Sequence, residues 1–195
     1  MKPITFDQTL ALADYERVRE LLRPLLIHAK ERRRLAVGSH LTFLFENNQT
    51  VWYQIQEMIR TEKMTTREAI QHEIDTYNEI LPGSDELVAT MLIEYGEPRE
   101  RDAALRRLVG LERHLWLKVA GKKIAAKFDD RQMSDERVSA VQFVRFPLEG
   151  LGAAGMIELA GRGEIAIEVD HPAMAASSAF SPSLGGALAE DLRQS

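Results

Sequence analysis

The sequence predicts an α+β protein in which N-terminal helices pack on a largely antiparallel β-sheet. Apolar residues recur at helical spacing through much of 1–110, whereas short alternating segments separated by turn residues dominate 111–195. The length of 195 residues and the hydrophobic content of 45% suit one ordinary core. We therefore expect a single α+β domain over residues 1–195, helix-rich over 1–110 and sheet-rich over 111–195, with about five to seven strands.

The first long helix is expected from Asp14 to about Leu35. Pro24 lies inside this pattern and removes one backbone hydrogen bond, so a kink or a break into two helices is expected there. The residues expected on its buried side are Val18, Leu21, Leu22, Leu25, Leu26 and Ala29. His40–Glu46 predicts a strand buried on both faces, and Asn47-Asn48 predicts the turn that follows it.

Two helices are expected between Thr50 and Pro82, the segment richest in aromatic, amide and carboxylate side chains. Thr65 is the expected N-cap of the second helix, with Glu68 completing a capping box. The buried stripe of that helix is expected to contain Ile70, Ile74, Tyr77 and Leu81.

The remaining elements alternate between strands and capped helices. Proline at a first helical position predicts helices that begin near Pro98 and after Ser181. The other expected elements are strands at 86–95 and 140–148, a hairpin formed by 114–120 and 123–129, and two strands around the turn 161–163. The small-residue run 148–155 is interpreted as a loop between strands, and Asp170-His171-Pro172 as the end of the last strand.

Four candidate metal ligands share one face of the second central helix. They are Glu68, His72, Asp75 and Glu79, and Glu57 or Glu62 is a candidate to complete the set. Carboxylates and a neutral imidazole at this spacing suit a divalent metal or an acid–base pair. The alternative interpretation is the solvated face of an amphipathic helix, because the sequence lacks both a second histidine at zinc-protease spacing and a repeated Glu-x-x-His.

A second group of polar side chains marks a candidate contact surface on the central helices. Its residues are Tyr53, Glu57, Arg60 and Tyr77, which are candidates for contacts with a partner or with a small molecule held between helices and sheet. The alternative interpretation is ordinary packing of an amphipathic helix.

Composition excludes several classes of function. The chain has no cysteine, which excludes a cysteine nucleophile and a thiolate-bound iron–sulfur cluster or zinc site. A net charge of −5 gives no general attraction to nucleic acid. The first 20 residues predict neither a signal peptide nor a membrane span, so a cytoplasmic location is expected. A homodimer is expected on the ground that a small sheet needs its edges covered.

Several segments resemble one family of uncharacterised bacterial proteins, classed as a domain of unknown function. The segments are TFLFEN (42–47), YQIQEM (53–58), HEIDTYNEILPG (72–83), ATMLIEY (89–95) and VDHP (169–172). The resemblance implies gene neighbours that encode a rubrerythrin-like protein and an iron–sulfur oxidoreductase, and hence a role near redox or peroxide defence. It implies no catalytic residue.

The leading functional hypothesis is a cytoplasmic accessory or interaction protein of a redox or peroxide-defence system. The alternative is a metal-dependent enzyme or metal-binding protein that uses the face of Glu68, His72, Asp75 and Glu79.

Overall fold

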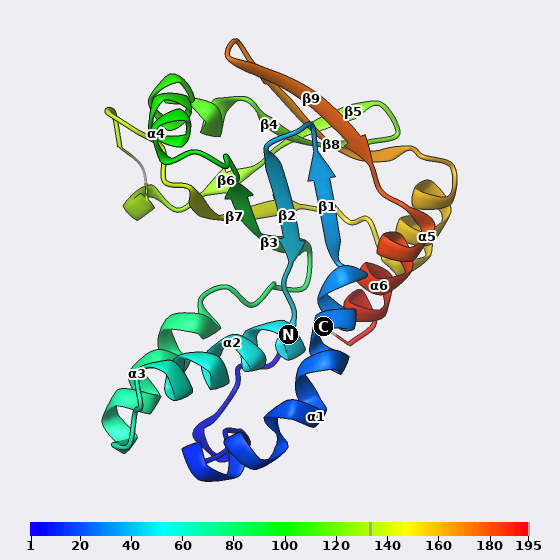
Figure 1. Cartoon of the computed structure of the whole chain (residues 1–195). Helices are drawn as coiled ribbons and strands as arrows, with labels where there is room; N and C mark the ends of the chain where they lie inside the picture. The colour runs from blue at the N-terminus through cyan, green and yellow to red at the C-terminus, as the bar shows by residue number, and fades with distance from the viewer. Residues whose placement is uncertain (133, 195) are drawn as a thin grey trace.

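The computed structural model describes residues 1–132 and 134–194, and it confirms the α+β class. The α-helices of these residues are not confined to the N-terminal half, because two of them lie within the segment predicted to be sheet-rich (Figure 1). They are α1 (Leu12–Glu31), α2 (Asn48–Thr61), α3 (Arg67–Asn78), α4 (Pro98–Arg107), α5 (Ala153–Gly161) and α6 (Pro182–Leu192). Short 3-10 turns are η1 (Phe6–Gln8), η2 (Leu111–Arg113) and η3 (Asp130–Gln132).

The strands of the described residues form two antiparallel sheets instead of the single sheet expected. Sheet A has the order β1-β2-β3-β7-β6 and sheet B the order β5-β4-β8-β9. The strands are β1 (Arg34–Val37), β2 (Leu41–Phe45), β3 (Glu86–Ile93), β4 (Leu115–Val119), β5 (Lys122–Ala125), β6 (Lys127–Phe128), β7 (Val141–Pro147), β8 (Ile165–His171) and β9 (Met174–Ala179).

Two hydrophobic cores hold these layers together. The first lies between the two sheets and extends to α4, α5 and α6, and Phe43, Phe45 and Phe146 are among its fully buried side chains. It joins residues from both sides of position 110, so the helix-rich and sheet-rich segments share it. The second core lies between α2 and α3 and reaches sheet A at Val88. Sheet A therefore has one face on the first core and part of its other face toward the helical layer.

Local sequence explains where most of the expected helices begin. Asn47 caps α2 by accepting a hydrogen bond from the Thr50 backbone amide at 3.0 Å, and Ser181 caps α6 in the same way. The structure corrects the expected cap of α3, because Thr66 and not Thr65 accepts the hydrogen bond from Ala69. Among the described residues, no helix combines the length and apolar character needed to cross a bilayer.

Helix α1 departs from its expected form in three ways. It ends at Glu31 and not near Leu35, because Arg34–Val37 pairs with β2 as strand β1. It continues through Pro24 as one helix, because Pro24 is on the exposed side, where water can satisfy the carbonyl that the proline leaves without an amide. Leu21 and Leu25, expected to be buried, are 75% and 65% exposed. Leu26 is buried as expected, and Tyr15, which was not expected to be buried, lies against α2 and donates a hydrogen bond to Glu57.

The segment 153–161 is a helix, although two strands were expected around the turn 161–163. Met156 and Ala160 are buried at a spacing of four residues, and α5 packs closely against α6. The alternation in MIELA is therefore incidental, and tertiary contact decides the conformation. Strand β9, which was not expected, has the small-residue sequence MAASSA and forms by pairing with β8.

A buried ion pair joins the end of α1 to the C-terminal helix. Arg33 and Asp191 are 6% and 7% exposed, and an Arg33 Nη2–Asp191 Oδ1 hydrogen bond measures 2.8 Å. Asn47, the cap of α2, also donates to Asp191, at 3.1 Å. This arrangement fixes three helices and the start of sheet A relative to one another.

Candidate functional site

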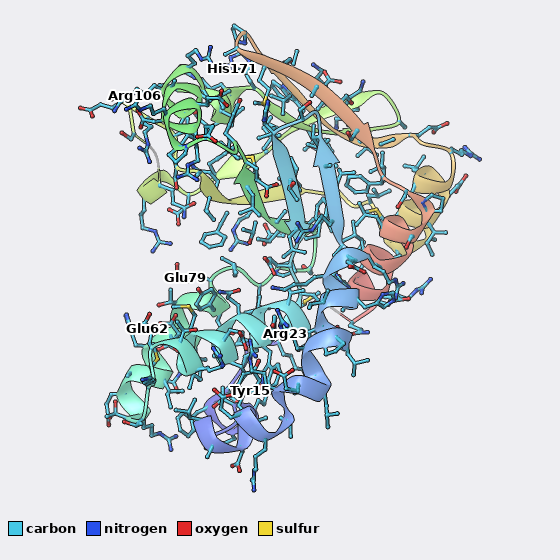
Figure 2. All side chains as sticks on the ribbon, in the orientation of Figure 1. Tyr15, Arg23, Glu62, Glu79, Arg106 and His171 are labelled. Atoms are coloured by element: carbon cyan, nitrogen blue, oxygen red, sulfur yellow. The ribbon has the colours of Figure 1, made fainter. Side chains whose placement is uncertain are left out.

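A cleft of about 680 Å³ lies between the end of α3 and sheet A, and we name it the interlayer cleft. Figure 2 labels Glu79, which is at this end of α3. The cleft is lined by Thr76, Glu79 and Ile80 on the helical side, by Val88, Lys127, Phe128, Phe143 and Arg145 on the sheet, and by Asp129, Arg131 and Gln132 from the η3 segment.

The apolar floor of the cleft follows from strand alternation. Val144 and Phe146 of β7 are buried in the first core, so Phe143 and Arg145 project from the opposite face of sheet A. Val88 of β3 pairs with Arg145 and belongs to the second core, against which Phe143 also packs. Hydrophobic surface is thus exposed to the cleft beside polar groups.

Two arginines hold the walls of the cleft in place. Arg131 Nη2 is 2.7 Å from Asp129 Oδ2 and 2.5 Å from Glu79 Oε2, which ties η3 to the end of α3. The Arg131 guanidinium keeps the pKa of Asp129 below its usual range, so Asp129 is a carboxylate at neutral pH. Arg145 pairs with Glu86 and also donates a hydrogen bond to the Glu79 carbonyl. Both arginines are therefore already matched by protein oxygens.

Lys127 differs from these arginines. It lies opposite Arg145 in the β6–β7 pair and lines the cleft. Within residues 1–132 and 134–194, its ammonium group has no hydrogen-bond or ion-pair partner. A positive charge without a partner, beside apolar surface, is suited to bind an anionic group attached to an apolar body.

The face of α3 predicted to bind metal is directed mainly to solvent. Glu68, His72, Asp75 and Glu79 are all exposed; Asp75 accepts a hydrogen bond from Gln71 at 2.8 Å, and Glu79 is paired with Arg131. Among the described residues, no group of three or more His, Asp or Glu side chains is arranged to hold a metal ion. Glu79 reaches the interlayer cleft, whereas Glu62 lies in the turn between α2 and α3 (Figure 2). The metal site stays a prediction.

The predicted contact residues of α2 mostly face α1. The Lys30 ammonium lies 4.9 Å from the centre of the Tyr53 ring, and Arg60 Nε lies 3.1 Å from Glu16 Oε1. Tyr77 of α3 instead packs in the second core, with its hydroxyl 3.5 Å from Gln54 Nε2. These side chains join helices to one another and do not line the interlayer cleft.

Glu57, the fourth predicted contact residue, is part of the α1–α2 interface. Its carboxylate accepts hydrogen bonds from Arg19 Nε at 2.8 Å and from the buried Tyr15 hydroxyl at 2.7 Å. The Arg19 guanidinium, and after it the Tyr15 hydroxyl, hold the pKa of Glu57 below its usual range. Burial, together with the Glu57 carboxylate, raises the pKa of Tyr15.

Glu57→Gln is expected to lower the free energy of unfolding by about 1–3 kcal/mol at neutral pH, because a neutral amide replaces the charged acceptor of Arg19 and Tyr15. The pKa of Glu57 is lower in the folded state, so the unfolded chain takes up the proton first as the pH falls. The stabilisation should be complete above the usual glutamate pKa of about 4.3 and disappear at lower pH.

Urea unfolding of the wild-type and Glu57→Gln proteins over a series of pH values measures this effect. Glu16→Gln is the matched control, since Glu16 pairs with Arg60 but is half exposed, and it should change stability by less than about 1 kcal/mol. The expectation would be contradicted if the difference in free energy of unfolding between wild type and Glu57→Gln stayed the same at acidic pH.

The sequence neighbours Asp170 and His171 do not form a pair. His171 is buried; its Nδ1 accepts from the Ala173 amide at 3.1 Å, and its Nε2 lies 3.2 Å from the Val109 carbonyl. This agrees with the structural role expected at the end of a strand. Asp170 instead pairs with His114, whose Nδ1 lies 3.0 Å from Asp170 Oδ1. Interactions with Trp116, Lys123 and His114 lower the pKa of Asp170.

Sequence reasoning missed most of the residues that line the interlayer cleft. The alternation of Phe143 and Arg145 against Val144 and Phe146 was visible in the sequence and places an arginine beside an apolar ring. The position of Lys127 opposite Arg145 depends on the β6–β7 register, which no local pattern specifies.

These features define an α+β protein with two antiparallel sheets and a cleft of ligand size between its helical layer and sheet A. The chain belongs to the family described as "Protein of unknown function (DUF3501)", whose model matches residues 3–192.

The chain is also similar to a solved structure from Burkholderia pseudomallei K96243, described as a novel protein of unknown function. The two chains share 36% identity and a TM-score of 0.86, and the match covers 97% of this chain and 99% of the other. No curated protein matches the chain. The comparisons confirm the resemblance to a family of unknown function, whereas the redox neighbours stay a prediction.

Proposed function

We propose that the protein is an accessory protein that binds a small organic anion in the interlayer cleft. Lys127 is the observation that supports this proposal, because it is a cleft cation without a protein partner among the described residues. The volume of about 680 Å³ is within the range of small-molecule sites.

The surrounding side chains favour one class of ligand. The Arg131 guanidinium pairs with both Glu79 and Asp129 and offsets one of their two negative charges, so these carboxylates repel an anion less than free carboxylates would. Phe143 offers an apolar surface on the same side of the sheet as Arg145. A carboxylate or phosphate attached to an aromatic or aliphatic body would therefore pair with Lys127 and cover the apolar floor.

Titration calorimetry with 1-naphthyl phosphate as the probe tests the proposal. We expect the probe to bind more tightly than 1-naphthol or inorganic phosphate, because only the probe combines the charge with the ring. Lys127→Gln should weaken its binding about 10-fold, which corresponds to the loss of one charge-assisted hydrogen bond of about 1.4 kcal/mol.

Lys122→Gln is the matched control, because Lys122 is an exposed lysine of sheet B that pairs with Glu149 and lies outside the cleft. It should leave the affinity unchanged. Equal affinities of wild type and Lys127→Gln for 1-naphthyl phosphate would overturn the assignment of the cleft, as would a complete lack of binding to the wild-type protein.

We propose further that this binding role serves a cytoplasmic redox or peroxide-defence system, as the family resemblance implies. The chain has no cysteine, so an iron–sulfur cluster or a redox thiol would belong to the partner, a rubrerythrin-like protein or an iron–sulfur oxidoreductase. Calorimetry with a purified rubrerythrin-like protein and with a purified iron–sulfur oxidoreductase from the same organism should detect a complex. If neither partner bound, the redox role would fail while the anion-binding role would still be open to its own test.

A divalent metal on the face of Glu68, His72, Asp75 and Glu79 is the alternative, and it would make the protein a metal-binding protein or an enzyme. Its support is the shared helix face alone. Metal analysis of protein purified without a chelator or an affinity tag would decide it, and a metal-free protein would remove this alternative.

A further inference from the structure

Helix α1 carries an apolar stripe on the face opposite to its contact with α2. Leu21 and Leu25 are 75% and 65% exposed, Ile27 is 41% exposed, and Pro24 lies among them on the exposed side. Large apolar side chains gathered along one helix face mark an interaction surface more often than single exposed leucines do. We name Leu21, Pro24, Leu25 and Ile27 the α1 stripe.

Charged residues lie at both ends of the α1 stripe, and the exposed Arg23 lies beside Pro24 and Ile27 within its span. Arg17 and Glu20 precede the stripe, and His28 and Glu31 follow it. All four side chains are exposed; Arg17 pairs with Asp14 one turn away, and His28 lies 3.7 Å from Glu31. Each end of the stripe therefore has one basic and one acidic side chain, with Arg17 outermost at one end and Glu31 outermost at the other.

We propose that the α1 stripe binds the α1 stripe of a second copy of this chain in an antiparallel arrangement. A two-fold axis near Pro24 places Arg17 opposite Glu31 of the second copy, because each lies seven residues from Pro24. The same axis places Glu20 opposite His28, each four residues from Pro24. Leu21, Leu25 and Ile27 of the two copies meet at the centre.

The antiparallel direction follows from the charges. Arg17 and Glu31 are separated by 14 residues, or roughly 21 Å along the helix, so antiparallel pairing forms both Arg17–Glu31 contacts at once. A parallel pair would instead place Arg17 against Arg17 and Glu31 against Glu31, and like charges at such contacts are unfavourable. The arrangement is independent of the interlayer cleft, since α1 contributes no residue to its lining.

Sedimentation equilibrium of the full chain tests the proposal. We expect a dimer with twice the mass of the 22.1 kDa chain, in equilibrium with monomer as the protein is diluted. Leu21→Glu should weaken association by about 10-fold or more, because it places two carboxylates in the apolar centre of the contact. Far-ultraviolet circular dichroism checks that the variant keeps its helices. A chain that is monomeric at every concentration overturns the proposal.

Charge exchange tests the predicted register. Arg17→Glu and Glu31→Arg should each weaken association by about 2- to 5-fold, since each places like charges opposite one another. The double variant Arg17→Glu/Glu31→Arg should recover the wild-type affinity, because the exchange restores opposite charges across the two-fold axis. If the double variant lost as much association free energy as the two single variants together, this antiparallel contact would be excluded.

A cysteine cross-link adds a readout that does not depend on affinity. The chain has no native cysteine, so one introduced residue reports one contact. Pro24→Cys lies at the proposed axis and should form an intermolecular disulfide under mild oxidation, whereas Arg17→Cys should not, because roughly 21 Å separates the two copies of that position. Cross-linking at both positions would indicate a parallel pair and contradict the proposal.

Discussion

Asp191→Ala is expected to lower the free energy of unfolding by about 3–5 kcal/mol. The substitution removes the carboxylate that neutralises Arg33 and leaves a guanidinium that is 6% exposed without its counter-charge. Asn47 at the start of α2 loses an acceptor at the same time. Because these contacts join α1, α2 and α6, the loss should affect the whole cooperative unit.

Guanidinium-induced unfolding of matched variants measures this effect. Glu190→Ala removes a neighbouring ion pair with Arg32, in which both side chains are about half exposed, and should cost less than about 1 kcal/mol. The double variant Arg33→Met/Asp191→Leu should be less destabilised than Asp191→Ala, since no charge is left buried. If Asp191→Ala and Glu190→Ala lowered the free energy of unfolding equally, the buried pair would stabilise the fold no more than an exposed pair does.

Gly185→Ala is the second substitution with a large expected effect. Gly185 is buried in α6 where this helix crosses α5, and an added Cβ would overlap the Cβ of Ala160 and lie 3.4 Å from the Met156 carbonyl oxygen. The two helices must move apart to accept the methyl group, and overpacking of this kind costs about 1–3 kcal/mol. Gly185→Val should cost more.

The adjacent glycine supplies a control of opposite sign. A Cβ at Gly186 would meet no atom within 4 Å, so Gly186→Ala should stabilise the protein by up to about 1 kcal/mol through helix propensity alone. Ala160→Gly should recover part of the stability lost in Gly185→Ala, because it removes the overlapping atom. Thermal unfolding of the wild type, Gly185→Ala, Gly186→Ala and the double variant Gly185→Ala/Ala160→Gly gives the sign of each change in stability. A stabilising Gly185→Ala would contradict the close packing of α5 on α6.

Of the site residues predicted from the sequence, Glu79 is the one that lines the interlayer cleft. The α3 pattern correctly placed Glu68, His72, Asp75 and Glu79 on one face, because helical spacing is a local property. That face is exposed, with Glu79 alone reaching the interlayer cleft, because the partners of a helix are chosen by tertiary packing. Lys127, which supports the proposed function, had no local signal, since its place depends on pairing with a distant strand.

The sequence by itself determined the α+β class, the start of α6 after Ser181, and strands such as β2 and β7. Each of these depends on residues close together in the chain. Tertiary structure alone decided that there are two sheets, that 153–161 is a helix, and that Leu21 and Leu25 remain exposed. Those outcomes depend on which apolar surfaces meet, and hydrophobic burial is non-directional, so the choice between partners is made only when the whole chain packs.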